Sequence, residues 1–115
     1  MVAVRAPDTP PEDPRESLDL TVLRAQTGGD AALEREVLAL FLAKSESDFV
    51  QISTASSADA RRAAAHALVG SARAVGADEV ARLAASVEHS SAVPLSLDSL
   101  RAALTAAHAF IRRRK

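Results

Sequence analysis

The sequence predicts an all-α protein, namely an antiparallel up-down four-helix bundle with a short additional N-terminal helix. Alanine and leucine dominate the 115 residues and aromatic residues make up only 3%, a composition that favours helix over sheet. Apolar residues recur with the period of a helix in four long segments. The connections between these segments are short, so we expect neighbouring helices to run antiparallel.

The chain begins with a segment that shows little apolar periodicity. Residues 1–17 contain four of the five prolines, so we expect a flexible, proline-rich tail. A short helix can then begin after Asp19 as N-cap and continue to about Gln26. Residues 27–29, Thr-Gly-Gly, should end it, because glycine suits the left-handed conformation at a helix C-terminus.

Asp30 is the predicted N-cap of a long second helix, which should end between residues 53 and 57. We expect its acidic residues to form a solvated face: Glu34, Glu36, Glu46 and Asp48. The inward side is predicted to carry Val37, Leu38, Phe41, Leu42, Ser45, Phe49 and Ile52.

Three further helices complete the prediction. Ser57 or Asp59 begins the third helix, and Gly76 is its predicted C-cap. Ala77 or Asp78 opens the fourth, whose inward stripe is Val80, Leu83, Ala84 and Val87. Residues 90–94 should end the fourth helix. Ser96 is the predicted N-cap of the fifth helix, with inward residues Leu97, Leu100, Leu104, Ala107 and Ile111.

Composition narrows the function classes. The formal net charge is −1, from 14 basic and 15 acidic residues, so nothing favours nucleic acid or a membrane surface as partner. The chain has no cysteine, which excludes disulfides and thiolate sites. Its first residues contain no long apolar run, so we expect no secretory leader, and no stretch approaches the roughly 20 apolar residues of a membrane span. We therefore expect a cytoplasmic protein.

His66 is the most informative side chain. It lies four residues before Gly70, and residues at this spacing share one face of a helix. The glycine costs about 1 kcal/mol relative to alanine but leaves a bare patch beside the imidazole. Projection at about 100° per residue puts His66 on the solvent side. The inward side then holds small or apolar residues: Ala60, Ala64, Leu68, Ser71 and Val75.

The segment around His66 also matches a known pattern. It reads His-Ala-Leu-Val-Gly-Ser-Ala over residues 66–72, and further matches follow at 76–77 (Gly-Ala), 80–81 (Val-Ala) and 87–88 (Val-Glu). With Leu18-Asp-Leu, Gly28-Gly29-Asp30 and Phe41 upstream, residues 18–115 resemble the histidine-containing phosphotransfer (HPt) domain of bacterial two-component phosphorelays. Residues 1–17 lie outside the resemblance.

The resemblance implies a phosphocarrier rather than an enzyme. His66 would accept a phosphoryl group from the aspartate of a receiver domain and pass it to another receiver. Ala63, Val69 and Gly70 would belong to the docking surface. The partners implied are response-regulator receivers or a hybrid histidine kinase, and we expect a monomer. No cofactor is expected on this chain, because Mg²⁺ would come with the receiver.

One position departs from the family pattern. Val69 stands where the family has a lysine thought to hold or steer the phosphoryl group. Arg73 lies on nearly the same line of the helix as His66, and Arg62 lies one turn before it. Either guanidinium could bind phosphate oxygens. We hypothesise that Arg73 partly takes the role of the lysine, with Arg62 as the second candidate.

Two other functions stay open. A degenerate HPt-like adaptor or inhibitor would bind a kinase or receiver without being phosphorylated. This alternative stays open because Val69 replaces the lysine of the family pattern. A histidine-kinase dimerisation module is disfavoured, because the chain lacks both the His-Glu-x-x-(Asn/Thr)-Pro sequence and an ATP-binding domain.

The remaining polar residues receive structural interpretations. His89 should lie at a helix C-terminus, where a cation suits the helix dipole, and His108 should lie at the boundary of the core. The histidines have no i, i+4 pairing, so no zinc site is predicted. Residues 112–115, Arg-Arg-Arg-Lys, are predicted to form a solvated helix end.

Overall fold

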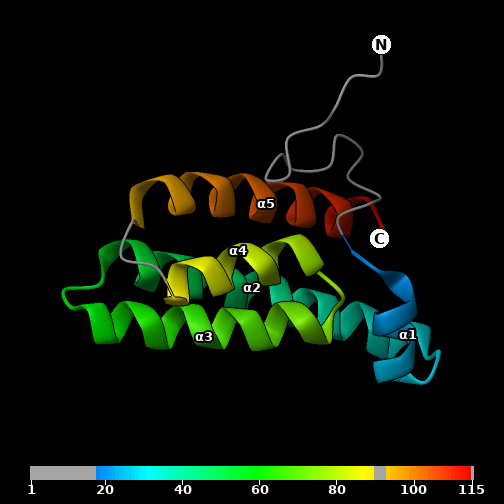
Figure 1. Ribbon diagram of the computed structural model, residues 1–115. Helices are drawn as coiled ribbons and strands as arrows, with labels where there is room; N and C mark the ends of the chain where they lie inside the picture. Colours follow the sequence, from blue (N-terminus) through cyan, green and yellow to red (C-terminus); the bar gives the residue numbers. More distant parts are fainter. Residues whose placement is uncertain (1–17, 90–92, 115) are drawn as a thin grey trace, which may run out of the picture.

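The computed structural model describes residues 18–89 and 93–114, without the side chains of residues 93–96. This part of the chain is all-helical, as predicted, and contains no strand. Its five helices are shown in Figure 1: α1 (Leu20–Thr27), α2 (Ala31–Thr54), α3 (Ala58–Ala74), α4 (Asp78–His89) and α5 (Val93–Arg113). The predicted N-terminal tail, residues 1–17, lies outside the described residues.

Local capping explains where the first three helices begin. The carboxylate of Asp19 accepts from the Thr21 N–H at 3.0 Å, and that of Asp30 accepts from the Leu33 N–H at 3.0 Å. The Ser57 hydroxyl accepts from the Ala60 N–H at 3.1 Å. These bonds satisfy backbone donors that have no partner within the helix. The predicted N-caps Asp19 and Asp30 are confirmed, and of the two alternatives for α3 Ser57, not Asp59, is the N-cap.

The start of the fifth helix was predicted wrongly. Ser96 is not its N-cap, because α5 already begins at Val93. Pro94 is therefore the second residue of the helix, where the missing N–H of a proline has no intrahelical acceptor to lose. The predicted break falls partly on residues 90–92, which lie outside the described residues.

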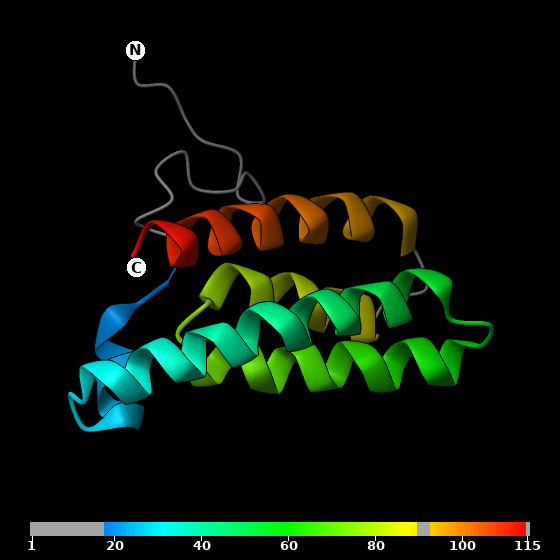
Figure 2. The same cartoon turned by 180° about the vertical axis from the view of Figure 1, so that it is seen from behind.

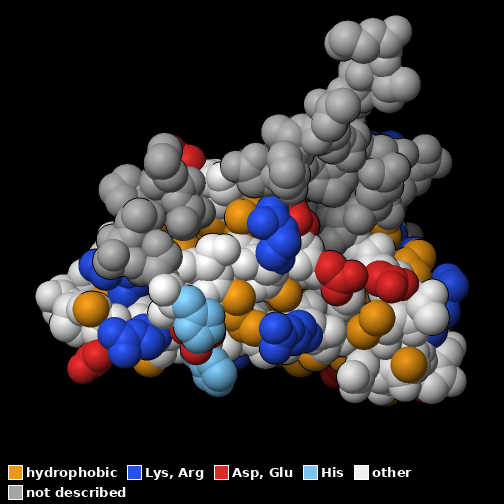
Figure 3. Space-filling model, viewed as in Figure 1, with side chains coloured by type: hydrophobic (Ala, Val, Ile, Leu, Met, Phe, Trp, Pro, Cys, Tyr) orange, Lys and Arg blue, Asp and Glu red, His pale blue; other side chains and the backbone are white. Residues whose placement is uncertain are grey.

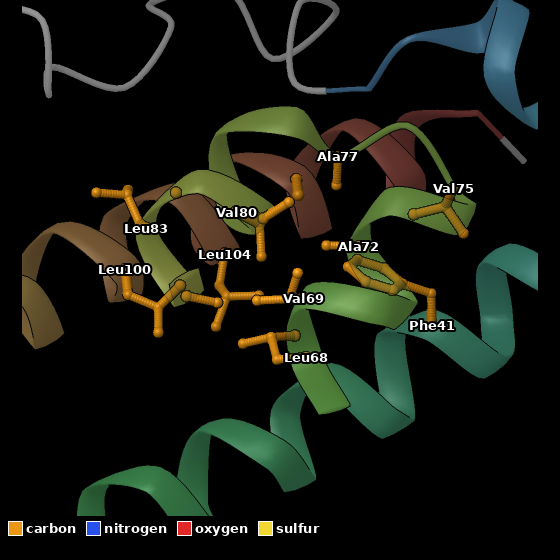
Figure 4. Close-up of a cluster of buried hydrophobic side chains, with 14 of the residues drawn as sticks. Phe41, Leu68, Val69, Ala72, Val75, Ala77, Val80, Leu83, Leu100 and Leu104 are labelled. Carbon is orange, nitrogen blue, oxygen red and sulfur yellow. The ribbon is translucent and has the colours of Figure 1, made fainter. Parts of the chain in front are cut away.

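The helices pack mainly against their neighbours in sequence. α3 contacts both α2 and α4, α5 contacts α4, and a further contact between α2 and α5 closes the arrangement. Seen from behind, α2 crosses the molecule between α5 and α3 (Figure 2). The apolar side chains of all five helices meet in one core, part of which is drawn in Figure 4. The stripe predicted for α4 is fully buried.

The turn between α3 and α4 holds α1 in place. Gly76 has a φ of +76°, and its carbonyl accepts from the Asp19 N–H at 2.8 Å. A Cβ on this residue would lie 2.4 Å from the Asp19 carbonyl oxygen. Glycine is thus required here both by the left-handed backbone and by the close approach of α1.

The solvated acidic face predicted for α2 is only partly correct. Glu34 and Asp48 are buried, whereas Glu36 and Glu46 are exposed. Glu34 forms an ion pair with Arg114 of α5, and Asp48 pairs with Lys44 at 3.1 Å. Both carboxylates lie on the inner side of α2, and a buried carboxylate is tolerated when it is paired.

His108 is buried rather than placed at the core boundary. Its Nε2 lies 2.8 Å from the hydroxyl of Ser45, which is also buried, so this hydrogen bond joins α5 to α2. The ring of Phe41 meets the imidazole edge-on, with ring centres 6.4 Å apart. Burial lowers the pKa of His108, assisted by Arg112 and Arg101 and opposed by Glu46.

None of the helices in the described part of the chain is long and apolar enough to cross a membrane.

Candidate functional site

His66 lies on the exposed side of α3, as predicted. Its side chain is 76% exposed, while the inward residues Ala64, Leu68 and Val75 are buried. Ala60, which was predicted to face inward, is exposed in the first turn of α3, and Ser71 is half-buried. Figure 3 shows histidine side chains open to solvent on this face, with Arg or Lys side chains to either side.

Glu88 of α4 fixes the orientation of the imidazole. Its Oε2 lies 2.8 Å from Nδ1 of His66. A carboxylate oxygen accepts hydrogen bonds, so this contact favours the tautomer in which Nδ1 carries the proton. Nε2 is then left with its lone pair directed away from Glu88. The Glu88 side chain is only 14% exposed, so the acceptor is held between α3 and α4 rather than moving freely in solvent.

Sequence reasoning quoted Glu88 as part of a motif but assigned it no role. A usable signal was present, because Glu88 lies in the last turn of α4, where the helix dipole disfavours an acid. The adjacent His89 is exposed, as a helix-end residue should be. Its Nε2 lies 3.8 Å from the other carboxylate oxygen of Glu88, so the two oxygens face two different imidazoles.

The surface next to His66 is bare at Gly70. A Cβ added at this position would meet no atom of another element or side chain within 4 Å. Gly70 has no left-handed backbone that would require glycine, so neither conformation nor packing explains the residue. Its effect is to leave open space one turn from the imidazole.

Two arginines flank His66 along α3, and both are exposed. Arg62 is already paired with Asp59 at 3.5 Å. Arg73 has no ion-pair partner among the described residues. Helical side chains tilt toward the N-terminus, so we expect Arg73 to extend back toward His66, while the ion pair with Asp59 directs Arg62 away from it. The geometry therefore favours Arg73 as the cation available to an anion on His66.

Val69 does not belong to the exposed surface, contrary to the prediction. It is only 5% exposed, and Figure 4 shows it within the buried cluster near Val80 and Leu104. The physical reason is that α4 packs closely along this side of α3. The buried side of α3 is therefore wider than the helical projection predicted. Ala63, the other apolar residue predicted for docking, is exposed.

The described residues contain no group of three or more His, Cys, Asp or Glu side chains placed to hold a metal ion. The site therefore consists of one oriented imidazole, the carboxylate that orients it, an open glycine and an available guanidinium. Such a set can supply a nucleophile and one positive charge.

Comparison with known proteins adds one result. A family model described as Hpt domain matches residues 36–110, more than half of the 115 residues. The matched segment includes His66, Gly70, Arg73 and Glu88. No curated protein and no solved structure gives a significant match.

Proposed function

The chain belongs to the Hpt domain family, and on this premise we propose that it carries a phosphoryl group on His66 between receiver domains of a two-component phosphorelay. Hpt domains are phosphocarrier modules rather than enzymes, and they interact with receiver domains and histidine kinases. The observation that carries the proposal is the exposed imidazole whose Nδ1 is held by Glu88 at 2.8 Å. This arrangement leaves Nε2 as the free nucleophile.

The transfer step follows from this geometry. The Nε2 lone pair of neutral His66 attacks the phosphorus of an aspartyl phosphate, and the bond from phosphorus to the aspartate oxygen breaks. The aspartate leaves as a carboxylate, so no proton has to move. The phosphorylated ring is a cation that keeps its Nδ1 proton, and the Glu88 carboxylate stabilises this positive charge as it forms. Positioning supplies most of the remaining catalysis in such in-line transfers.

The incoming receiver supplies what this chain does not. We infer that the aspartyl phosphate and Mg²⁺ come with the receiver, and that this chain binds no cofactor. Arg73 would balance the phosphate charge in place of the lysine that Val69 replaces, with Arg62 as a weaker second cation. Gly70 and Ala63 would form the centre of the docking surface. Because the contact must form and release quickly, we expect an interface below about 1,200 Å² in total.

The broader assignments follow the family. We infer that residues 18–115 form the functional domain, since α1 shares the core of the matched segment. Short connections and the packing of successive helices support an antiparallel up-down bundle. We further propose a monomeric protein of the bacterial cytoplasm.

The test is phosphotransfer from a panel of phosphorylated receiver domains. The expected result is acid-labile, base-stable phosphate on the wild type and none on His66→Gln. His89→Gln is the matched control, because it removes an exposed histidine that also faces Glu88, and it should still be labelled. Receiver binding without any label would overturn the carrier proposal and support the adaptor alternative.

A further inference from the structure

A second surface feature lies between α2 and α5. Its floor is apolar and includes Leu38, Leu42 and Ile111. The groove encloses about 280 Å³, which is at the lower limit for a small-molecule site but sufficient for a few side chains of a peptide. The phosphotransfer mechanism uses none of these residues.

The rim of the groove is basic. Arg35 of α2 and Arg112 and Arg114 of α5 line it. Arg114 is paired with the buried Glu34, whereas Arg35 and Arg112 have no ion-pair partner among the described residues. An apolar floor between unpaired guanidinium groups suits a segment that alternates apolar and acidic side chains.

Residues 7–16 of this chain have that chemistry. They read Pro-Asp-Thr-Pro-Pro-Glu-Asp-Pro-Arg-Glu. Pro7 and Pro10 are three residues apart, as are Pro11 and Pro14, so in a polyproline II helix the two pairs would lie on two neighbouring edges. The segment also carries four carboxylates against one arginine. Its prolines complement the apolar floor of the groove, and its net negative charge complements the basic rim.

The covalent connection brings this segment to the groove. Leu20 of α1 lines a neighbouring hollow together with Phe110 and Arg114, and Arg114 also lines the groove. Figures 1 and 2 both place the start of α1 beside the C-terminal end of α5. Ten extended residues span about 33 Å, whereas the groove from Ala31 to Leu42 extends about 16 Å along α2.

We propose that residues 7–16 dock in the α2–α5 groove of their own chain, with the prolines on Leu38, Leu42 and Ile111 and the acidic side chains on Arg35 and Arg112. Attachment through a short linker gives an effective concentration in the millimolar range, so weak contacts suffice. The docked segment covers the seam where α2 meets α5 and leaves the His66 face open. The proposal does not depend on phosphotransfer.

The chain has no cysteine, so one nitroxide label can be placed without background. We would label Thr9→Cys in the 115-residue chain and compare amide signals in the oxidised and reduced states of the nitroxide. The expected result is selective loss of the Leu38, Leu42 and Ile111 signals. Thr54, about 24 Å from Leu38 along α2, serves as the internal reference and should keep its signal. Uniform loss, or no loss, would overturn the proposal.

Charge reversal supplies the specific control. The double variant Arg35→Glu and Arg112→Glu should abolish the selective signal loss, as should 1 M salt, because such contacts are screened. The comparison variant Arg24→Glu and Arg61→Glu reverses two arginines outside the groove, of which Arg24 is exposed and Arg61 half-buried. It should leave the selective signal loss unchanged. Equal losses in both double variants would contradict the assigned contacts, and the amide spectra report directly whether each variant is folded.

Discussion

At the scale of single residues, the position that governs the chemistry of His66 is Glu88. We predict that Glu88→Gln slows phosphotransfer about five- to tenfold, because a neutral acceptor replaces a charged one and about 1 kcal/mol of stabilisation is lost as the ring becomes cationic. Transfer rates from one fixed receiver, together with the ¹⁵N shifts of the His66 ring, would measure the change.

Glu36→Gln is the control for that prediction, since Glu36 is an exposed acid of α2. It should transfer like the wild type and leave the ring shifts in place. A Glu88→Gln protein with unchanged rate and unchanged Nδ1 protonation would show that the carboxylate neither orients the imidazole nor stabilises its charge.

Arg73 is the second residue with a predicted role. We expect Arg73→Ala to lower the transfer rate and shorten the lifetime of the phosphohistidine, because no described residue competes for this guanidinium. Arg62→Ala should have a smaller effect, since Arg62 is engaged with Asp59 and extends away from His66. The rates at which phosphohistidine decays in the two variants test whether Arg73 has the larger effect. Equal phosphohistidine decay in Arg73→Ala and in the wild type would contradict a role of Arg73 in stabilising the phosphoryl group.

At the scale of one helix, Gly70 separates stability from function. Gly70→Ala should stabilise the protein by up to about 1 kcal/mol, because an exposed helix interior gains from alanine and the added methyl meets nothing within 4 Å. The same methyl fills the bare patch beside His66, so we expect receiver-dependent transfer to fall several-fold. Urea unfolding and transfer kinetics on one preparation measure both.

Two comparisons make the Gly70 result interpretable. Labelling by phosphoramidate, a small donor that needs no docking surface, should be unchanged in Gly70→Ala. Gly76→Ala should instead lose stability, since a methyl there would lie 2.4 Å from the Asp19 carbonyl oxygen. If Gly70→Ala were destabilised as well, the patch would be a packing position rather than open surface.

The helix level also shows how far sequence reasoning extends. Asp19 and Asp30 were predicted correctly as caps, and Ser57 as one of two alternatives, because a cap depends on residues within one turn. Val69 was misplaced because its burial depends on how closely α4 lies along α3, which the pattern of α3 alone does not contain. The exposure of His66 was predictable, since it lies opposite the inward residues Ala64, Leu68 and Val75.

At the scale of the whole molecule, the unpredicted features are contacts between distant segments. The pairs Glu34–Arg114 and Ser45–His108 each join α2 to α5. Neither pair could be predicted from periodicity. The hydrogen-bond or ion-pair partner of a buried polar residue depends on which other helix packs against it, and the pattern of one helix does not contain that information. His66 and Glu88 follow the same rule, which is why the partner of the nucleophile became visible only in three dimensions.

His108 makes the stability of the molecule depend on pH. Burial lowers its pKa in the folded state, so between that value and the ordinary value of about 6.5 the unfolded chain binds more protons. The contribution of neutral His108 to the free energy of unfolding is therefore fully present above about pH 6.5. It falls as the pH decreases below that value, with a slope of at most about 1.4 kcal/mol per pH unit. The neighbouring charges, Glu46, Arg101 and Arg112, only adjust this shift.

We predict that urea unfolding between pH 8 and pH 5 shows this loss in the wild type and a smaller one in His108→Gln. At pH 8 that variant should be less stable by about 1–3 kcal/mol, because the bond to Ser45 is weakened or lost. Carboxylates far from His108 affect both proteins alike and cancel in the difference. His89→Gln, which changes an exposed imidazole, should keep the wild-type slope. If the slope survived in His108→Gln, the α2–α5 contact would not be the acid-sensitive part of the fold.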